Sequence, residues 1–159
     1  MYQKVLVPLD GSEVAECVLP HVDAIAQGCR AKNVTFIYVA KPLDISMWTS
    51  QEGLPWVNQE DLNRYDLEAK AVGEQYLSKI LDQIKYKGVD VQPQVILGEP
   101  AADVITDYAT KNGADLIIMS THGRSGISRW VWGSVSDHIL RAACIPILMV
   151  RAPGCVPGI

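Results

Sequence analysis

Short apolar runs rich in β-branched residues alternate along this chain with longer segments whose apolar residues recur every three or four positions. The short runs predict strands at residues 4–10, 33–40, 89–97, 115–120 and 146–151. The longer segments predict helices at residues 12–30, 61–87, 100–113 and 134–144. Because strands joined by helices pair in parallel through right-handed crossovers, the alternation predicts a doubly wound α/β fold, an open parallel sheet with helices on both faces.

Two of the helical segments carry additional local signals. Segment 12–30 repeats apolar residues on one helical face, at Val14, Val18, Val22 and Ile25, and Pro20 within it predicts a local distortion. Segment 100–113 begins with a proline and ends with a glycine, which is the asymmetry expected of helix termini.

Length and charge exclude several classes of protein. A chain of 159 residues with 48% hydrophobic residues can bury a full core, so we expect a single domain over residues 1–159. A formal net charge of −4 argues against nucleic acid as a partner. No apolar run approaches the roughly 20 residues that span a bilayer, and no signal sequence is present, so we expect a cytoplasmic protein without membrane contact. Four cysteines without a C-x-x-C pair predict neither a zinc ribbon nor a thioredoxin-like site.

One connection falls outside the alternation. Residues 41–59 form a longer link than is usual in such folds, and they contain Trp48 and Trp56. The segment is either a lid over a site or a loop that the two tryptophans pin to the body or to a second subunit.

The first candidate site follows the first strand. Ligands in open α/β sheets bind beyond the carboxyl ends of the strands, where the winding reverses. Asp10 stands at such an end and is suited to accept hydrogen bonds from a ribose hydroxyl or an adenine amine. The alternative is a helix cap, formed by Asp10 with Glu13 or by Ser12.

The second candidate site is STHGRSGISRWVWGS, residues 120–134, after the fourth strand. Its glycines permit left-handed backbone angles or close approach of a ligand. Ser134 to Asp137 match a capping box, which predicts a helix beginning at Ser134 with a positive dipole end that favours an anion. The alternative is that the glycines and the helix start serve packing alone.

Two common phosphate-binding motifs and a catalytic triad were considered, and none is predicted. The chain has no G-x-x-x-x-G-K-[ST] loop and no G-x-G-x-x-G fingerprint. His138 directly follows Asp137, but neighbouring side chains on a helix point apart, so no catalytic triad is predicted with Ser134 or Ser136. Lone histidines and the lack of a carboxylate pair predict no metal site and a binding role in place of catalysis.

Four stretches in order and spacing resemble the universal stress protein family: KVLVPLDGSE, VILGEPA, DLIIMSTHGRSG and WGSVSDHILRAACIPILMVR. The resemblance covers essentially the whole chain. The ATP-binding branch of that family has the pattern G-2x-G-9x-G-[ST], and Gly123, Gly133 and Ser134 match its last three fixed positions. Ser120 stands at the first, where the pattern has glycine. Its hydroxyl is able to bond a ribose, or its Cβ to crowd one.

This resemblance implies a Rossmann-like sheet of the adenine nucleotide alpha hydrolase type, with strand order 3-2-1-4-5. It also implies a site for ATP, with or without Mg²⁺, or for ADP or AMP. The residues carried over as nucleotide-binding are Pro8, Leu9, Asp10, Val39, Met119, Ser120, His122, Gly123, Gly133, Ser134, Val135 and Ser136. Gly98 would lie near the rim or serve only its turn.

The resemblance further implies a homodimer that pairs through the last strand, 146–151; the alternative is that the C-terminal tail covers this apolar edge. Three functions remain open. The first is a nucleotide-dependent switch in a stress response that contacts protein partners. The second is a scaffold dimer without nucleotide. The third is a weak ATPase or self-phosphorylating protein with Ser134 or Ser136 as acceptor.

Overall fold

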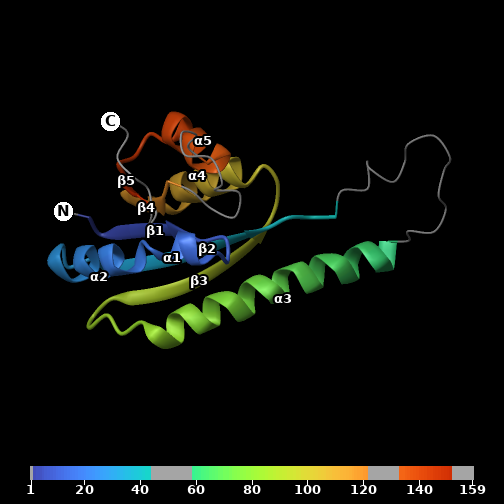
Figure 1. Cartoon of the computed structure of the whole chain (residues 1–159), viewed down its shortest axis with the longest axis horizontal. Coiled ribbons are helices and arrows are strands. Elements are labelled where there is room, and N and C mark those ends of the chain that lie inside the picture. Colours follow the sequence, from blue (N-terminus) through green and yellow to red (C-terminus); the bar gives the residue numbers. More distant parts are fainter. Residues whose placement is uncertain (1, 44–58, 122–132, 152–159) are drawn as a thin grey trace.

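Five parallel strands form one sheet in the order β3-β2-β1-β4-β5, and helices lie against both of its faces (Figure 1). The computed structural model describes residues 2–43, 59–121 and 133–151. The doubly wound fold and the strand order expected from the sequence are confirmed. The order reverses at β1, which has β2 on one side and β4 on the other.

The elements agree with the predicted alternation. The strands are β1 (Lys4–Pro8), β2 (Asn33–Ala40), β3 (Asp90–Leu97), β4 (Leu116–Ser120) and β5 (Ile147–Val150). The helices are α1 (Glu13–Glu16), α2 (Leu19–Gly28), α3 (Gln59–Gln83), α4 (Ala101–Asn112) and α5 (Ser134–Ala142).

The single helix predicted for residues 12–30 is wrong, because the structure has two helices there, α1 and α2. Ser12 caps α1 by accepting a hydrogen bond from the Ala15 backbone N–H at 3.1 Å. Pro20 lies in the first turn of α2 and has no N–H to donate to the carbonyl of Glu16, so one continuous helix would lose a bond at this point. The predicted distortion at Pro20 is therefore a break.

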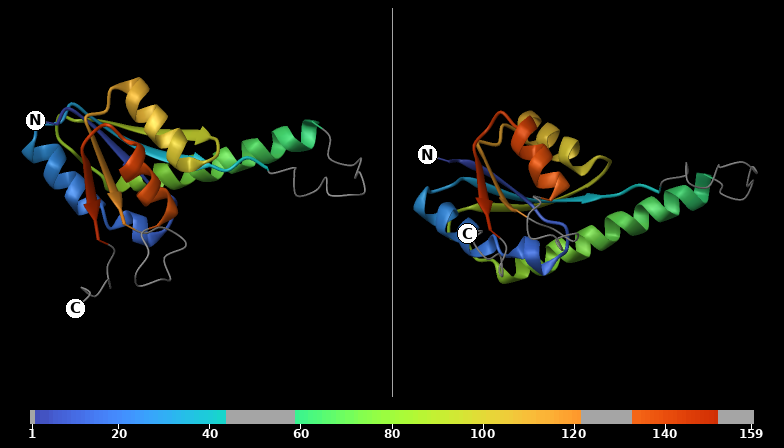
Figure 2. Two further views of the ribbon diagram at one scale, coloured as in Figure 1. Left: turned by 90° about the horizontal axis from the view of Figure 1, so that it is seen from above. Right: turned by 45° about the horizontal axis from the view of Figure 1, so that its top comes forward.

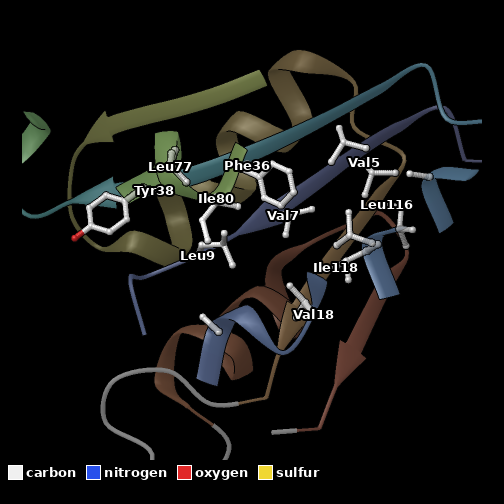
Figure 3. Packing of buried hydrophobic residues seen from close by; sticks show 14 of the residues in the cluster. Val5, Val7, Leu9, Val18, Phe36, Tyr38, Leu77, Ile80, Leu116 and Ile118 are labelled. Carbon is white, nitrogen blue, oxygen red and sulfur yellow. The ribbon is translucent and has the colours of Figure 1, made fainter. Parts of the chain in front are cut away.

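Alternate residues of the central strands fill two separate cores. Val5 and Val7 of β1 point to the face covered by α1, α2 and α3, together with Phe36 of β2 (Figure 3). Leu6 points to the opposite face, which α4 and α5 cover. Burying a side chain such as Phe36 contributes about 1.5 to 3 kcal/mol to the stability of the fold. Because the central strands are buried on both faces, their sequences are nearly continuous apolar runs.

Helix α3 is 25 residues long, and its N-terminal part extends beyond the ends of the strands (Figures 1 and 2). It crosses the sheet closely at Gly73, where an added Cβ would lie 2.6 Å from Cδ1 of Tyr38. In the described part of the chain, neither α3 nor any other helix is long and apolar enough to cross a membrane.

Candidate functional site

The loops after β1 and β4 begin next to each other, because these strands pair directly. From this point the chain turns to opposite faces of the sheet, with β1 leading to α1 and β4 leading toward α5. Two backbone hydrogen bonds hold the strand ends: Leu9 donates to Ile37 at 2.9 Å, and Thr121 donates to Val150 at 2.9 Å. A crevice at such a reversal is the expected ligand position in an open α/β sheet.

A pocket of about 270 Å³ lies at this reversal. That volume is near the lower end of the roughly 300 to 1,000 Å³ typical of sites for small ligands. The residues that line it are Pro8, Leu9, Asp10, Ala15, Val39, Ala101, Ile105, Met119, Ser120, Gly133, Ser134, Val135 and Ser136. Its lining therefore comes from the strands β1, β2 and β4, from the turn after β1, and from the N-terminal parts of α1, α4 and α5.

All candidate binding residues that lie in the described ranges converge on this pocket, although they come from distant parts of the sequence. They run from Pro8 at the end of β1 to Ser136 in α5. His122 and Gly123 fall outside the described residues, as do most of the 41–59 connection and its two tryptophans.

Three lining residues were not predicted: Ala15 in α1, and Ala101 and Ile105 in α4. Ala101 and Ile105 are four residues apart and therefore share one face of α4. The four-residue spacing could have predicted that both residues face the pocket, but it is equally typical of a helix face that packs on the core. Gly98 is absent from the lining, and a Cβ there would lie 2.7 Å from Cγ2 of Val104, so this glycine allows close packing of the turn.

Asp10 organises the turn between β1 and α1. One of its carboxylate oxygens accepts hydrogen bonds from the Ser12 backbone N–H at 3.0 Å and the Ser12 hydroxyl at 2.6 Å. Of the two caps that the sequence allowed, Ser12 is the cap of α1. Asp10 thus combines a structural role in the turn with a position on the pocket wall.

Tyr76 of α3 lies behind this turn. Burial is the largest cause that raises the pKa of Tyr76, and the carboxylates of Glu16 and Asp10 raise it further. The hydroxyl therefore stays protonated at physiological pH. The ring of Tyr76 packs against that of Tyr38 in β2, with 5.9 Å between the ring centroids, so this contact joins α3 to the sheet.

The start of α5 differs from the predicted capping box. Gly133 is the N-cap, Ser134 is the first helical residue, and no side chain caps the helix. The Ser136 hydroxyl instead donates to two backbone carbonyls that share its proton, that of Thr121 at 2.9 Å and that of Gly133 at 2.8 Å. The first intrahelical bond runs from the Asp137 N–H to Gly133 at 2.9 Å, so the preceding N–H groups have no acceptor within the helix.

Helix α4 presents a second N-terminus to the same pocket. Pro100 is its N-cap, and no side chain caps it. At the other end, Gly113 adopts φ 63° and closes the helix as predicted. Since Ala101 of α4 and Ser134 of α5 both line the pocket, two helix ends with positive partial charge border it. The arrangement suits an anionic group beside an apolar body.

Within residues 2–43, 59–121 and 133–151, no group of three or more His, Cys, Asp or Glu side chains could hold a metal ion. His138 Nε2 of α5 lies 2.9 Å from a carboxylate oxygen of Asp103 in α4.

A doubly wound parallel sheet with a small-ligand pocket at its reversal point defines a Rossmann-like α/β protein. The description "Universal stress protein family" belongs to the family model that matches residues 1–151, and the chain belongs to this family. Universal stress protein MJ0531 of Methanocaldococcus jannaschii is 31% identical over 153 residues, which cover 96% of this chain and 84% of that protein.

Solved structures share the fold. The structure of MJ0577, another M. jannaschii protein, superposes with a TM-score of 0.79 at 26% identity and covers 95% of this chain and 96% of that one. A universal stress protein family protein from Arabidopsis thaliana, solved with AMP bound, has a TM-score of 0.60 at 17% identity. That match covers 96% of this chain and 93% of the plant protein.

Proposed function

We propose that the pocket binds an adenine nucleotide, ATP foremost, and that the chain acts in a stress response as a nucleotide-dependent switch. One observation carries the proposal: the uncapped N-termini of α4 and α5 border a single pocket that also has apolar walls. Phosphates bind at such helix ends because the free N–H groups and the dipole both favour negative charge. The AMP bound to the Arabidopsis relative makes adenine nucleotides the first class to test.

Different residues of the pocket lining suit different parts of a nucleotide. Leu9, Val39 and Met119 offer apolar surface for the base, with Pro8 beside them. Asp10 is the carboxylate of the lining and suits a ribose hydroxyl or the adenine amine. The N–H groups of Ser134, Val135 and Ser136, behind the Gly133 cap, suit the phosphates, and Mg²⁺ would enter with them. His122 and Gly123 complete the proposed site on the sequence pattern alone.

Ser120 is the residue that tests this assignment most directly. It ends β4, is 8% exposed and lies on the pocket wall. A glycine there would leave more room, whereas serine contributes a Cβ and a hydroxyl. This residue favours the second candidate function, a scaffold dimer of the same fold that binds no nucleotide.

The experiment has two stages. The protein is purified without added nucleotide and denatured, and released small molecules are identified by mass spectrometry; ATP, ADP and AMP are then titrated by calorimetry. We expect co-purified or micromolar ATP, and a loss of affinity of roughly tenfold or more in Gly133→Val, because Gly133 lines the pocket and the substitution adds bulk at this wall. The control is Gly28→Ala, since a Cβ on Gly28 has nothing within 4 Å.

An empty protein that binds none of the three nucleotides would overturn the proposal and leave the scaffold dimer. Release of inorganic phosphate, or label retained on Ser134 or Ser136 after incubation with γ-labelled ATP, would identify the weak ATPase or self-phosphorylating alternative.

We also propose a homodimer that pairs along β5. This strand stands at one end of the sheet, and its side chains are half-buried from Ile147 to Met149. Soluble sheets seldom leave such an apolar edge open.

A further inference from the structure

Four basic residues gather at the end of the sheet opposite the pocket, and we call them the basic corner. Arg30 and Lys32 lie in the connection between α2 and β2, and Lys85 and Lys87 lie in the connection between α3 and β3. Both connections stand at the same end of the molecule (Figure 1). The Asp90 backbone N–H, at the start of β3, donates to the Lys32 carbonyl at 2.9 Å and so holds them side by side.

The basic corner carries positive charge that no carboxylate neutralises by direct contact. All four side chains are exposed, and within the residues that the structure describes none of them forms an ion pair. By contrast, Arg64, Lys111 and Arg141 each bind a carboxylate on their own helix. Residues 28–32 and 84–89, which form the two connections, contain no Asp or Glu.

The carboxylates that come next along the chain bind neutral amides. Asp90 accepts hydrogen bonds from Asn33 Nδ2 at 3.2 Å and from Gln92 Nε2 at 2.6 Å. Asp23 of α2 accepts one from Gln27 Nε2. Their bonds therefore leave the four cations of the basic corner available to an external anion.

The backbone of Arg30 gives a second reason to look for a partner at this corner. Arg30 adopts φ 53°, in the left-handed region that favours glycine. It follows Cys29, the C-cap of α2, and the turn closes through the Ala31 N–H to the Ala26 carbonyl at 3.0 Å and the Arg30 N–H to the Gln27 carbonyl at 3.3 Å. Glycine is the usual residue at this position, so the fold alone does not explain an arginine there.

We propose that the basic corner is a docking surface for an acidic segment of a partner protein. Clusters of arginine and lysine recognise acidic motifs through charge-assisted hydrogen bonds. Because the basic corner lies at the amino ends of the strands, away from the pocket, the inference does not depend on the nucleotide function.

Two observations favour an acidic protein segment over other polyanions. The net charge of the chain is −4, so an extended nucleic acid would meet the acidic remainder of the surface. A membrane surface requires an apolar anchor beside the charges for stable binding. In the described part of the chain, the exposed large hydrophobic side chains all lie outside the basic corner; they are Tyr65, Leu67, Val72, Val135 and Leu140.

The test measures binding of a fluorescent peptide of eight glutamates by anisotropy, at about 50 mM and about 300 mM salt, since contacts between exposed charges weaken with salt. We expect Lys32→Gln and Lys87→Gln each to weaken binding about two- to fivefold, the range of exposed charge pairs. The double variant Lys32→Glu, Lys87→Glu should not bind. Lys70→Gln is the matched control, because Lys70 is an exposed lysine of α3 outside the basic corner, and its affinity should equal that of wild type.

Arg30→Gly separates docking from folding. Glycine adopts the left-handed conformation without strain, so the urea midpoint should rise or stay constant while the affinity for the peptide falls about two- to fivefold. Lower stability with unchanged binding would mean that Arg30 serves the fold and is not part of the docking surface.

Two further results would overturn the proposal. The first is a wild-type protein that does not bind the glutamate peptide, or that binds it no better than the double variant does. The second is tighter binding of an eight-nucleotide oligothymidine or of phosphatidylserine vesicles, again lost in the double variant, which would assign the basic corner to nucleic acid or to a membrane instead.

Discussion

The Ser136 hydroxyl donates to the backbone carbonyl of Thr121 at 2.9 Å and thereby ties the first turn of α5 to the end of β4. Ser136 is 3% exposed, and its hydroxyl also lies 2.8 Å from the Gly133 carbonyl, so its proton serves the backbone. This contact determines where the N–H groups of α5 stand relative to the strand ends that form the rest of the pocket.

Ser136→Ala should therefore weaken both the fold and the site. Removing the donor leaves a partly buried carbonyl without this partner, at a cost of about 1 kcal/mol in the free energy of unfolding. Urea denaturation measures this loss, and calorimetry should show weaker ATP binding because the first turn of α5 is less restrained. Unchanged stability would mean that the backbone N–H groups of Gly133 and Asp137, which also donate to the carbonyls of Thr121 and Gly133, satisfy these carbonyls without the hydroxyl.

Ser120→Gly should tighten ATP binding. Ser120 is 8% exposed on the pocket wall, and the substitution removes both a Cβ and a hydroxyl from that wall. Room for about one extra methylene changes affinity by roughly tenfold, while glycine within a strand lowers stability by about 0.5 to 1 kcal/mol. Calorimetry and urea denaturation separate the two effects. Weaker binding in the variant would instead show that the hydroxyl bonds the nucleotide.

The alternation of apolar runs was sufficient for the fold class, because the central strands β1, β2 and β4 are buried and need apolar residues on both faces. The break between α1 and α2 was harder to predict. Val18 and Val22 keep the helical period across the break and are both buried in the same core. The missing N–H of Pro20 is the one local signal, and sequence alone does not tell a kink from a break.

The residues of the site likewise include some that the sequence predicted and some that it did not. Residues at the ends of β1 and β4 were predictable because parallel strands end at the same edge of a sheet. Ile105 was missed because it belongs to the core under α4 and also lines the pocket, and one apolar position serves both purposes. The start of α5 at Ser134 was predicted correctly, but the capping box was not found, because Gly133 is the N-cap and no side chain caps the helix.

Gly73→Ala should destabilise the fold, although alanine favours helices. Its Cβ would lie 2.6 Å from Cδ1 of Tyr38, so Tyr38 or α3 must shift, at a cost of about 1 to 3 kcal/mol. The control is Gly28→Ala at the end of α2, where an added Cβ meets nothing within 4 Å and stability should rise or stay constant. Thermal or urea denaturation of both variants measures the contrast. Equal responses would show that α3 does not press on the sheet at Gly73.

The β5 edge offers a prediction about assembly that is independent of nucleotide. Pro146 and Val150 direct their carbonyls to β4, where they accept from Ile117 at 3.0 Å and Thr121 at 2.9 Å. Because backbone groups alternate along a strand, Ile147 and Met149 direct theirs to the outer edge. Met149→Pro would remove an outward N–H without breaking a bond to β4.

We expect wild type to be a dimer by light scattering after size exclusion, and Met149→Pro to be a monomer, because pairing between edges depends on the outward N–H groups. Met149→Ala is the matched control: it loses the same side chain from the core beneath α4 and α5 but keeps the N–H, and it should remain a dimer. A dimeric Met149→Pro would move the interface away from β5. If wild type is a monomer, another part of the same chain must cover the β5 edge, because an open apolar strand edge tends to pair with a second strand.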